Sequence, residues 1–143
     1  MKHILTGFLA VFAMLFLANC TSQMTNSDNV KKEWMLVEFQ DFSKDMMVAN
    51  KANVNFTSIK DAGKFSANMG CNNMFGTATF SGNGMVKFSQ MGSTMMFCDK
   101  AMDLEAAFGK ALPTMTHYKI EGHYLTLSDN TGKSMKFVAS DWD

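Results

Sequence analysis

The residue types best suited to chemistry in this chain are its cysteines, which stand at Cys20, Cys71 and Cys98. Cys20 follows an almost unbroken apolar run from Ile4 to Ala18, and the run has a basic start. Such a run is too short to span a membrane as a helix and has the build of a secretory signal. We therefore expect residues 1–19 to be a signal peptide that is removed on export.

The end of this run, Leu17-Ala18-Asn19-Cys20, is similar to a bacterial lipobox, in which the cysteine becomes the lipidated first residue. Asn19 departs from the small residue that normally precedes the cysteine, so an ordinary secreted protein is the alternative. We expect Cys20 to be the lipid attachment site and residues 20–33 to be a flexible polar tether. Thr21 favours an outer membrane lipoprotein that faces the periplasm and is held there by its lipid anchor.

Cys71 and Cys98 are the thiols that remain once Cys20 is acylated. An exported domain meets an oxidising compartment, where a pair of cysteines is usually bridged. We expect a disulfide between them. The alternatives are two free buried cysteines and a redox pair, although redox pairs normally sit close together in sequence.

Nucleophilic catalysis would need a histidine within hydrogen-bond reach of a serine or cysteine, and a third group to orient the ring. The mature chain offers His117, which strand alternation places outward, and His123, which lies beside a turn. Two histidines and two bridged cysteines also lack the ligand spacing of a zinc site. We expect no enzyme activity, no metal site and no cofactor.

Methionines allow one further chemical interpretation. Met91, Met95 and Met96 precede Cys98, and thioethers beside a thiolate suit Cu(I) in an envelope protein. However, the chain has 15 methionines in total, so methionine replaces branched aliphatic residues throughout. We favour this structural role over copper binding.

Length and composition limit the architecture that could position these residues. The chain has 143 residues, of which 47% are hydrophobic and 18% charged, and this suits one folded domain, expected at residues 34–143. Thirteen lysines offset thirteen acidic residues, so the formal charge is zero. We expect no nucleic acid partner, because such partners need a basic patch.

Most of the domain has the period of two that is typical of strands wet on one face. A hairpin turn is indicated at Asn83-Gly84, because both residues tolerate positive φ. We expect eight short strands, at residues 34–39, 53–58, 64–69, 75–80, 86–89, 117–121, 125–127 and 135–137.

One segment has helical spacing instead. Ala101, Leu104, Phe108 and Ala111 recur at intervals of three and four residues, which predicts a helix at about residues 99–112. Asp99 could cap its start, and Pro113 would end it. The fold class is therefore mainly β (α+β), with antiparallel strands curled into a barrel-like sheet and one inserted helix.

Three stretches of this pattern, at residues 68–76, 93–98 and 105–112, resemble the META domain family, also called the HslJ-like family. A late stretch from Tyr118 to Leu127 is similar as well, and the resemblance spans residues 34–138. The residues that match the family motifs are Trp34, Gly70, Cys71, Asn72, Gly76, Thr94, Met95, Cys98, Glu105 and Phe108.

Members of that family are small envelope or secreted proteins linked to heat shock, drug tolerance or virulence, with no established catalytic activity. The resemblance implies a non-enzymatic envelope lipoprotein that acts in stress or antibiotic tolerance through contacts with an unknown envelope protein. The alternative is a carrier that holds a small apolar ligand in the barrel mouth. The many phenylalanines on inward positions argue that the interior is filled instead.

The stretch between Gly70 and Gly76 has a structural and a functional interpretation. Glycines at both ends predict a sharp corner, in which Asn72 and Asn73 would bond to nearby backbone groups. A ligand site built from the two asparagine amides is the alternative, and nothing else in the sequence supports it.

Overall fold

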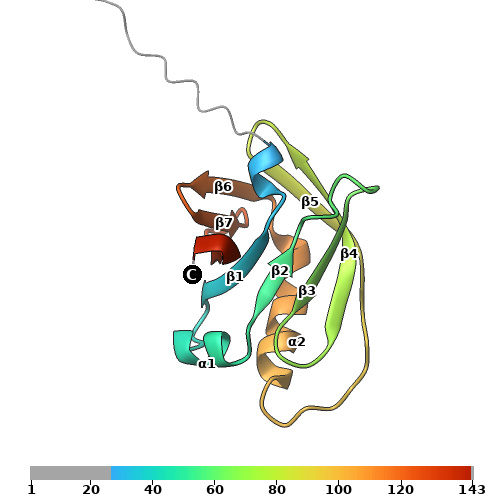
Figure 1. Cartoon of the computed structure of the whole chain (residues 1–143), viewed down its shortest axis with the longest axis vertical. Helices are drawn as coiled ribbons and strands as arrows, with labels where there is room; N and C mark the ends of the chain where they lie inside the picture. Colours follow the sequence, from blue (N-terminus) through green and yellow to red (C-terminus); the bar gives the residue numbers. More distant parts are fainter. Residues whose placement is uncertain (1–26, 143) are drawn as a thin grey trace, which may run out of the picture.

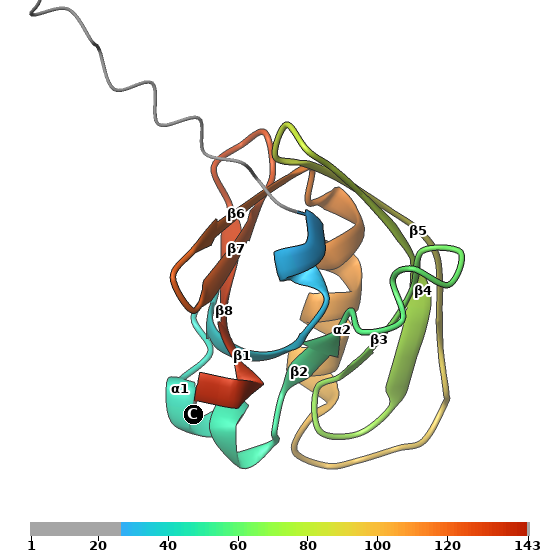
Figure 2. The same ribbon diagram turned by 45° about the horizontal axis from the view of Figure 1, so that its top comes forward.

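The computed structural model describes residues 27–142, and these residues form a closed barrel of eight antiparallel strands (Figures 1 and 2). Each strand pairs with the next one along the chain, and the last strand pairs with the first. The strands are β1 (Glu33–Phe39), β2 (Asn53–Asn55), β3 (Lys64–Asn68), β4 (Asn73–Ser81), β5 (Met85–Ser93), β6 (His117–Glu121), β7 (Tyr124–Ser128) and β8 (Ser134–Ala139). The mainly β fold class expected from the alternating pattern is confirmed.

Alternate residues of the strands fill the barrel with side chains. Phe56 is fully buried and packs against Phe65, Phe80 and Phe88, with ring centroids 5.0 to 6.4 Å apart. Met135 and Phe137 of β8, the last strand of the chain, face the same core. These phenylalanines therefore occupy the interior, as the sequence pattern indicated.

Helix α2 (Met102–Ala111) and the 3₁₀ helix η2 (Leu112–Thr114) lie between β5 and β6 in the chain. These two strands share a single register pair, Met85 with His117, so the barrel wall is weakest there. Leu112 of η2 and Leu104 and Phe108 of α2 join the core, and the α2 ring of Phe108 meets that of Phe39 edge-on at 6.2 Å. The apolar stripe of α2 thus completes the core beside the short seam.

The helix begins later than expected. Its N-cap residue is Ala101, which makes no side-chain capping bond, whereas Asp99 lies in the preceding turn. Cys98 is held by the disulfide and residue 96 is held by Asn72, so the chain turns once more before it can become helical. The expected cap at Asp99 is therefore wrong, although Pro113 does end the α-helix by forcing a 3₁₀ turn.

Two further differences concern the segment between β1 and β3. Helix α1 (Lys44–Ala49) is absent from the sequence-based interpretation, although the Ser43 side chain caps it by accepting a hydrogen bond from Met46 N. Strand β2 ends at Asn55 and does not reach residue 58. The Asn55 side chain accepts bonds from Thr57 N and Oγ1, and this local turn ends the strand.

The folded domain begins earlier than residue 34. The 3₁₀ helix η1 (Ser27–Val30) precedes β1, Val30 is fully buried, and the Trp34 indole Nε1 donates to its carbonyl at 2.9 Å. The part of the expected tether from residue 27 to residue 33 is therefore structured, because an apolar side chain there completes the core. The signal peptide, Cys20 and the rest of the tether lie outside the described residues. Within residues 27–142, none of the helices has both the length and the apolar character to cross a membrane.

Candidate functional site

A disulfide joins Cys71 and Cys98, as predicted, with a Cα–Cα distance of 5.9 Å. Cys71 lies in the corner after β3 and is buried, and Cys98 lies in the segment that leads from β5 to α2. The bridge therefore ties a corner of the sheet to the chain that approaches the helix. Neither sulfur is free to act as a thiolate.

Asn72, next to the bridge, uses its whole carboxamide inside the protein. Its Oδ1 accepts hydrogen bonds from Met96 N at 2.7 Å and from Thr94 Oγ1 at 2.8 Å. Its Nδ2 donates to the Met96 carbonyl at 3.0 Å and to Glu105 Oε1 at 2.7 Å. An amide has two donors and two acceptor sites, so all four are occupied.

Glu105 forms a second hydrogen bond with Asn72 and so fixes this residue further. Glu105 is buried in the first turn of α2, and its Oε2 accepts a further hydrogen bond from Asn72 N at 2.6 Å. Charge-assisted hydrogen bonds are shorter and stronger than neutral ones. The positive end of the helix also favours a carboxylate at this position. Glu105 thus connects the corner, the loop and the helix in one network.

Thr94 joins the network to the sheet. Its hydroxyl accepts from Asn73 N at 3.1 Å, and its own N–H donates to the Asn73 carbonyl at 3.1 Å. The Asn73 side chain accepts from Asn68 Nδ2 at 3.0 Å. Both asparagines therefore help to build the corner, but only Asn72 bonds to backbone groups as predicted, because the Asn73 side chain bonds to the side chain of Asn68.

Three consecutive apolar side chains project from the loop that this network holds. Met95 is 98% exposed, Met96 is 55% exposed and Phe97 is 82% exposed. We call Met95, Met96 and Phe97 the apolar tip. Figure 1 places the segment that enters α2 at the opposite end of the molecule from η1. Exposed apolar clusters of this kind mark interaction sites.

The two motif glycines have different roles. Gly70 has φ +111°, and a Cβ there would lie 2.7 Å from the Asn50 Cβ, so the corner requires glycine. Gly76 instead lies within β4 beside an irregularity in its pairing with β5. A Cβ on Gly76 would lie 3.0 Å from the Phe65 ring. The expectation that Gly76 ends the corner is therefore wrong, because close packing rather than a turn requires it.

The structure thus divides the motif residues into two groups. Gly70, Cys71, Asn72, Thr94, Met95, Cys98 and Glu105 come together around the loop. Trp34, Gly76 and Phe108 serve the barrel and its core.

The histidines lie apart from the loop. The His117 ring hydrogen-bonds to Thr116 through Nδ1, and the His123 ring stacks on Trp142. Among residues 27–142 we find no group of three or more His, Cys, Asp or Glu side chains placed to hold a metal ion.

The sequence interpretation missed a groove beside α1, lined in part by Lys44 and Trp142. The signal that could have located it is the Ser43 cap followed by Asp45 and two methionines, which is typical of a helix start.

A small closed β-barrel with a helix inserted between β5 and β6 and a disulfide-locked loop is the class of protein that this geometry defines. The family model of the META domain matches residues 27–142, and the chain belongs to this family. No curated protein matches the chain in sequence.

Solved structures of other proteins share the fold. A Burkholderia xenovorans protein solved by NMR has a TM-score of 0.59 and 17% identity, over 77% of this chain and 82% of that one. A crystal structure of a DUF4847 family protein from Bacteroides vulgatus has a TM-score of 0.54 and 17% identity, over 80% and 96% of the two chains. At this identity, the likeness concerns the fold alone.

Proposed function

We propose that this chain is a non-enzymatic envelope lipoprotein that acts in stress or antibiotic tolerance by binding another envelope protein through the apolar tip. The observation that carries the proposal is the contrast between an exposed apolar surface and the fixed backbone beneath it. Met95 and Phe97 are almost fully exposed, yet the loop around them is held by a disulfide and by Asn72.

A fixed backbone matters because binding is opposed by the entropy lost when flexible groups become ordered. The Met96 N–H and carbonyl are both bonded to Asn72, so the backbone at the centre of the tip is held in place before a partner arrives. Methionine side chains adapt to differently shaped partner surfaces, and a phenylalanine ring supplies a large apolar anchor. Together these features suit protein recognition.

The position of the tip supports a partner away from the anchoring membrane. The described fold begins at η1, and the apolar tip belongs to the segment at the other end of the molecule (Figure 1). A lipid on Cys20 would hold the η1 end close to the outer membrane. The tip would then point into the periplasm.

The experiment is complementation of a deletion strain that has been screened against heat, detergents and antibiotics. We expect the wild-type chain to restore tolerance and the double variant Met95→Ser, Phe97→Ser to fail, at equal abundance in the envelope. The matched control is Met85→Ser, which removes another exposed apolar side chain, 38% exposed at the start of β5. A photoreactive residue at position 97 should also cross-link to one protein, and the same residue at position 83 should not.

Full complementation by the double variant would contradict the proposal. Loss of tolerance with the Met85→Ser control would also contradict it, because the effect would then not belong to the tip. Both variants change exposed side chains, so we expect both to fold. A thermal midpoint equal to that of the wild type checks this.

A further inference from the structure

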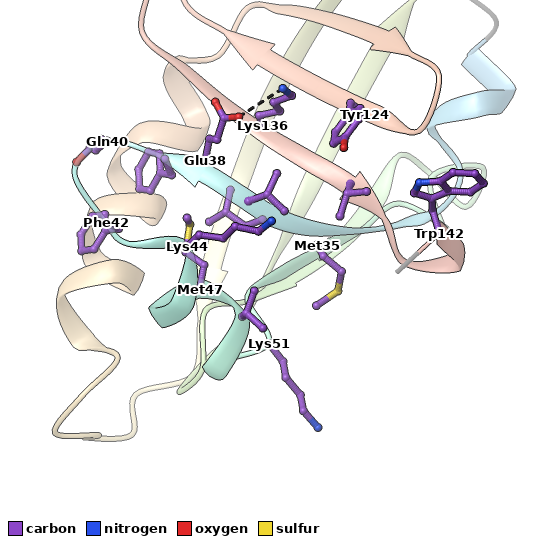
Figure 3. A pocket seen from close by; sticks show the side chains of 15 residues that line it. Met35, Glu38, Gln40, Phe42, Lys44, Met47, Lys51, Tyr124, Lys136 and Trp142 are labelled. Atoms are coloured by element: carbon purple, nitrogen blue, oxygen red, sulfur yellow. Dashed lines mark hydrogen bonds and ion pairs between the residues drawn. The ribbon is translucent and has the colours of Figure 1, made fainter.

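A groove of about 920 Å³ runs along the outside of the barrel, between α1 and the outer face of β1, β8 and β7 (Figure 3). Its floor is apolar. Met35 and Val37 of β1 and Val138 of β8 lie along it, and Met47 and Val48 of α1 form one wall. The outer face of a barrel normally carries polar residues. An apolar stripe here therefore needs an explanation.

The local pairing of β1 with β8 produces this floor. Met35 pairs with Val138, and the register shifts between Leu36 and Glu38, so that Val37 has no partner of its own. A bulge of this kind re-aims side chains. Leu36 is buried in the core, whereas Val37 lines the outer groove. Val37 thus faces outward by ordinary alternation, and the bulge leaves Glu38 outward beside it and returns Phe39 to the core.

Aromatic rings stand at both ends of the groove (Figure 3). Phe42 stacks on Phe39 with centroids 5.8 Å apart, and Trp142 stacks on His123 with centroids 3.5 Å apart. Trp142 belongs to the 3₁₀ helix η3 (Ser140–Trp142), in which Asp141 forms an ion pair of 3.0 Å with Lys32. The hydrogen bond from the Lys32 ammonium in this pair lowers the pKa of Asp141. The groove is therefore elongated and bounded, a shape that fits a linear chain.

The charges around the groove are mainly positive. Its lining includes Lys44, Lys51 and Lys136 but a single acidic residue, Glu38. Lys136 pairs with Glu38 at 3.4 Å and lies over the Tyr124 ring at 4.8 Å. Within residues 27–142, neither the Lys44 nor the Lys51 side chain forms an ion pair. Figure 3 shows Lys44 reaching along the groove and Lys51 pointing away from it.

We propose that this groove binds a free fatty acid, with the acyl chain along the floor and the carboxylate beside the Lys44 ammonium. The apolar floor and the excess positive charge match an amphiphile with one anionic end. A peptide that binds by strand addition does not fit, because the barrel wall is closed and β1 is paired on both sides. This site lies outside the apolar tip, so the inference stands apart from the proposed protein contact.

The test uses the full chain with Cys20→Ser, which removes the acyl attachment point and allows work without detergent. The probe is the fluorescent fatty acid cis-parinaric acid. We expect saturable binding that palmitic acid displaces, while methyl palmitate and hexadecylamine compete at least tenfold more weakly. Equal competition by the methyl ester would overturn the role of the carboxylate, and absence of saturable binding would overturn the site.

Variants of groove residues test where the fatty acid binds. We expect Lys44→Gln to weaken palmitate about fivefold, the effect of losing one exposed ion pair. Val48→Asp should weaken it at least tenfold, and the exposed position of Val48 keeps this variant folded. The control Lys110→Gln changes a lysine that lines a different groove and should leave affinity unchanged. Unchanged affinity in Lys44→Gln and Val48→Asp, with a normal thermal midpoint, would overturn the proposal.

A last experiment distinguishes binding of a free fatty acid from binding to a lipid surface. Vesicles of phosphatidylglycerol present the same acyl chains and negative charge, but in a bilayer. We expect the Cys20→Ser chain to bind palmitate and not to sediment with the vesicles. Sedimentation that Lys44→Gln abolishes, together with no binding of free palmitate, would assign the groove to a membrane surface and overturn the proposal.

Discussion

Glu105 and Asn72 are 33 residues apart in the chain, yet the carboxylate of Glu105 accepts hydrogen bonds from both the backbone and the side-chain nitrogen of Asn72. This pair fixes the corner after β3 against the first turn of α2. Because Asn72 also holds both polar backbone groups of Met96, the same pair sets the position of the apolar tip.

Replacing Glu105 with Gln should destabilise the domain. A neutral amide has one acceptor oxygen, whereas Asn72 presents two N–H donors to this side chain, so one donor would lose its partner in a buried place. We expect a loss of about 2 kcal/mol in the free energy of unfolding, measured with urea. The control Glu121→Gln breaks an exposed ion pair with Lys119 and should cost less than about 1 kcal/mol. Equal losses in the two variants would contradict the role of the Asn72 pair.

Replacing Gly70 with Ala should also destabilise the domain. The residue has φ +111°, and the new Cβ would lie 2.7 Å from the Asn50 Cβ. We expect a loss of more than about 1 kcal/mol in unfolding free energy. The control is Gly82→Ala, because a Cβ on Gly82 has no atom within 4 Å. If the thermal midpoints of both variants equal that of the wild type, the corner does not depend on glycine.

The Cys71–Cys98 bridge should contribute a large share of the stability. For a closed loop of about 28 residues, the chain-entropy relation gives about 3.6 kcal/mol. We expect the double variant Cys71→Ser, Cys98→Ser to lose close to this amount. In the denatured, unreduced protein extracted from the envelope, a thiol reagent should react with neither cysteine. Two reactive thiols per chain would show that the bridge does not form in the cell.

The reduced protein should melt at a modest temperature. Methionine in place of branched aliphatics makes the core more deformable, lysine without arginine forgoes bidentate ion pairs, and one proline restricts the unfolded chain little. Mesophilic domains cluster near about 45 to 65 °C, so we expect a midpoint at or below about 50 °C after reduction. Calorimetry that gives a cooperative transition well above 65 °C would contradict this compositional reasoning.

Cys20 should carry lipid in the exported protein. We expect the intact mass of the membrane-extracted chain to equal residues 20–143 plus acyl groups, because the apolar run before Cys20 ends in a near-lipobox. Replacement by Cys20→Ser should remove the acyl mass and release the protein from the membrane fraction. A mature chain that starts at another residue without acyl mass would rule out the anchor.

The sequence by itself determined most of the barrel. Alternating residues such as Phe65 with Ser66 and Met135 with Lys136 encode which face of a strand is buried, and this information is local. Helical spacing from Leu104 to Phe108 located α2 for the same reason. Local signals were weaker where side chains act on the neighbouring backbone, so Ser43 as a helix cap and Asn55 as a strand end were missed.

The site was only partly determined by local pattern. The family motifs identified Asn72, Thr94 and Glu105, but they did not indicate that one carboxamide would bind all its partners within the protein. That depends on distances between segments more than 20 residues apart. The register shift beside Val37 and the stacking of Trp142 on His123 are likewise absent from any single stretch of sequence.

The tertiary structure alone therefore decided the apolar tip and the outer groove. A methionine in the sequence is equally consistent with burial and exposure, because its side chain is apolar and adaptable. Met47 is buried and Met95 is 98% exposed, and the difference arises only when α1 packs on the sheet and the disulfide draws residue 98 to residue 71. Burial depends on the surroundings that the whole chain supplies after folding, whereas the alternation of a strand is already present in its own residues.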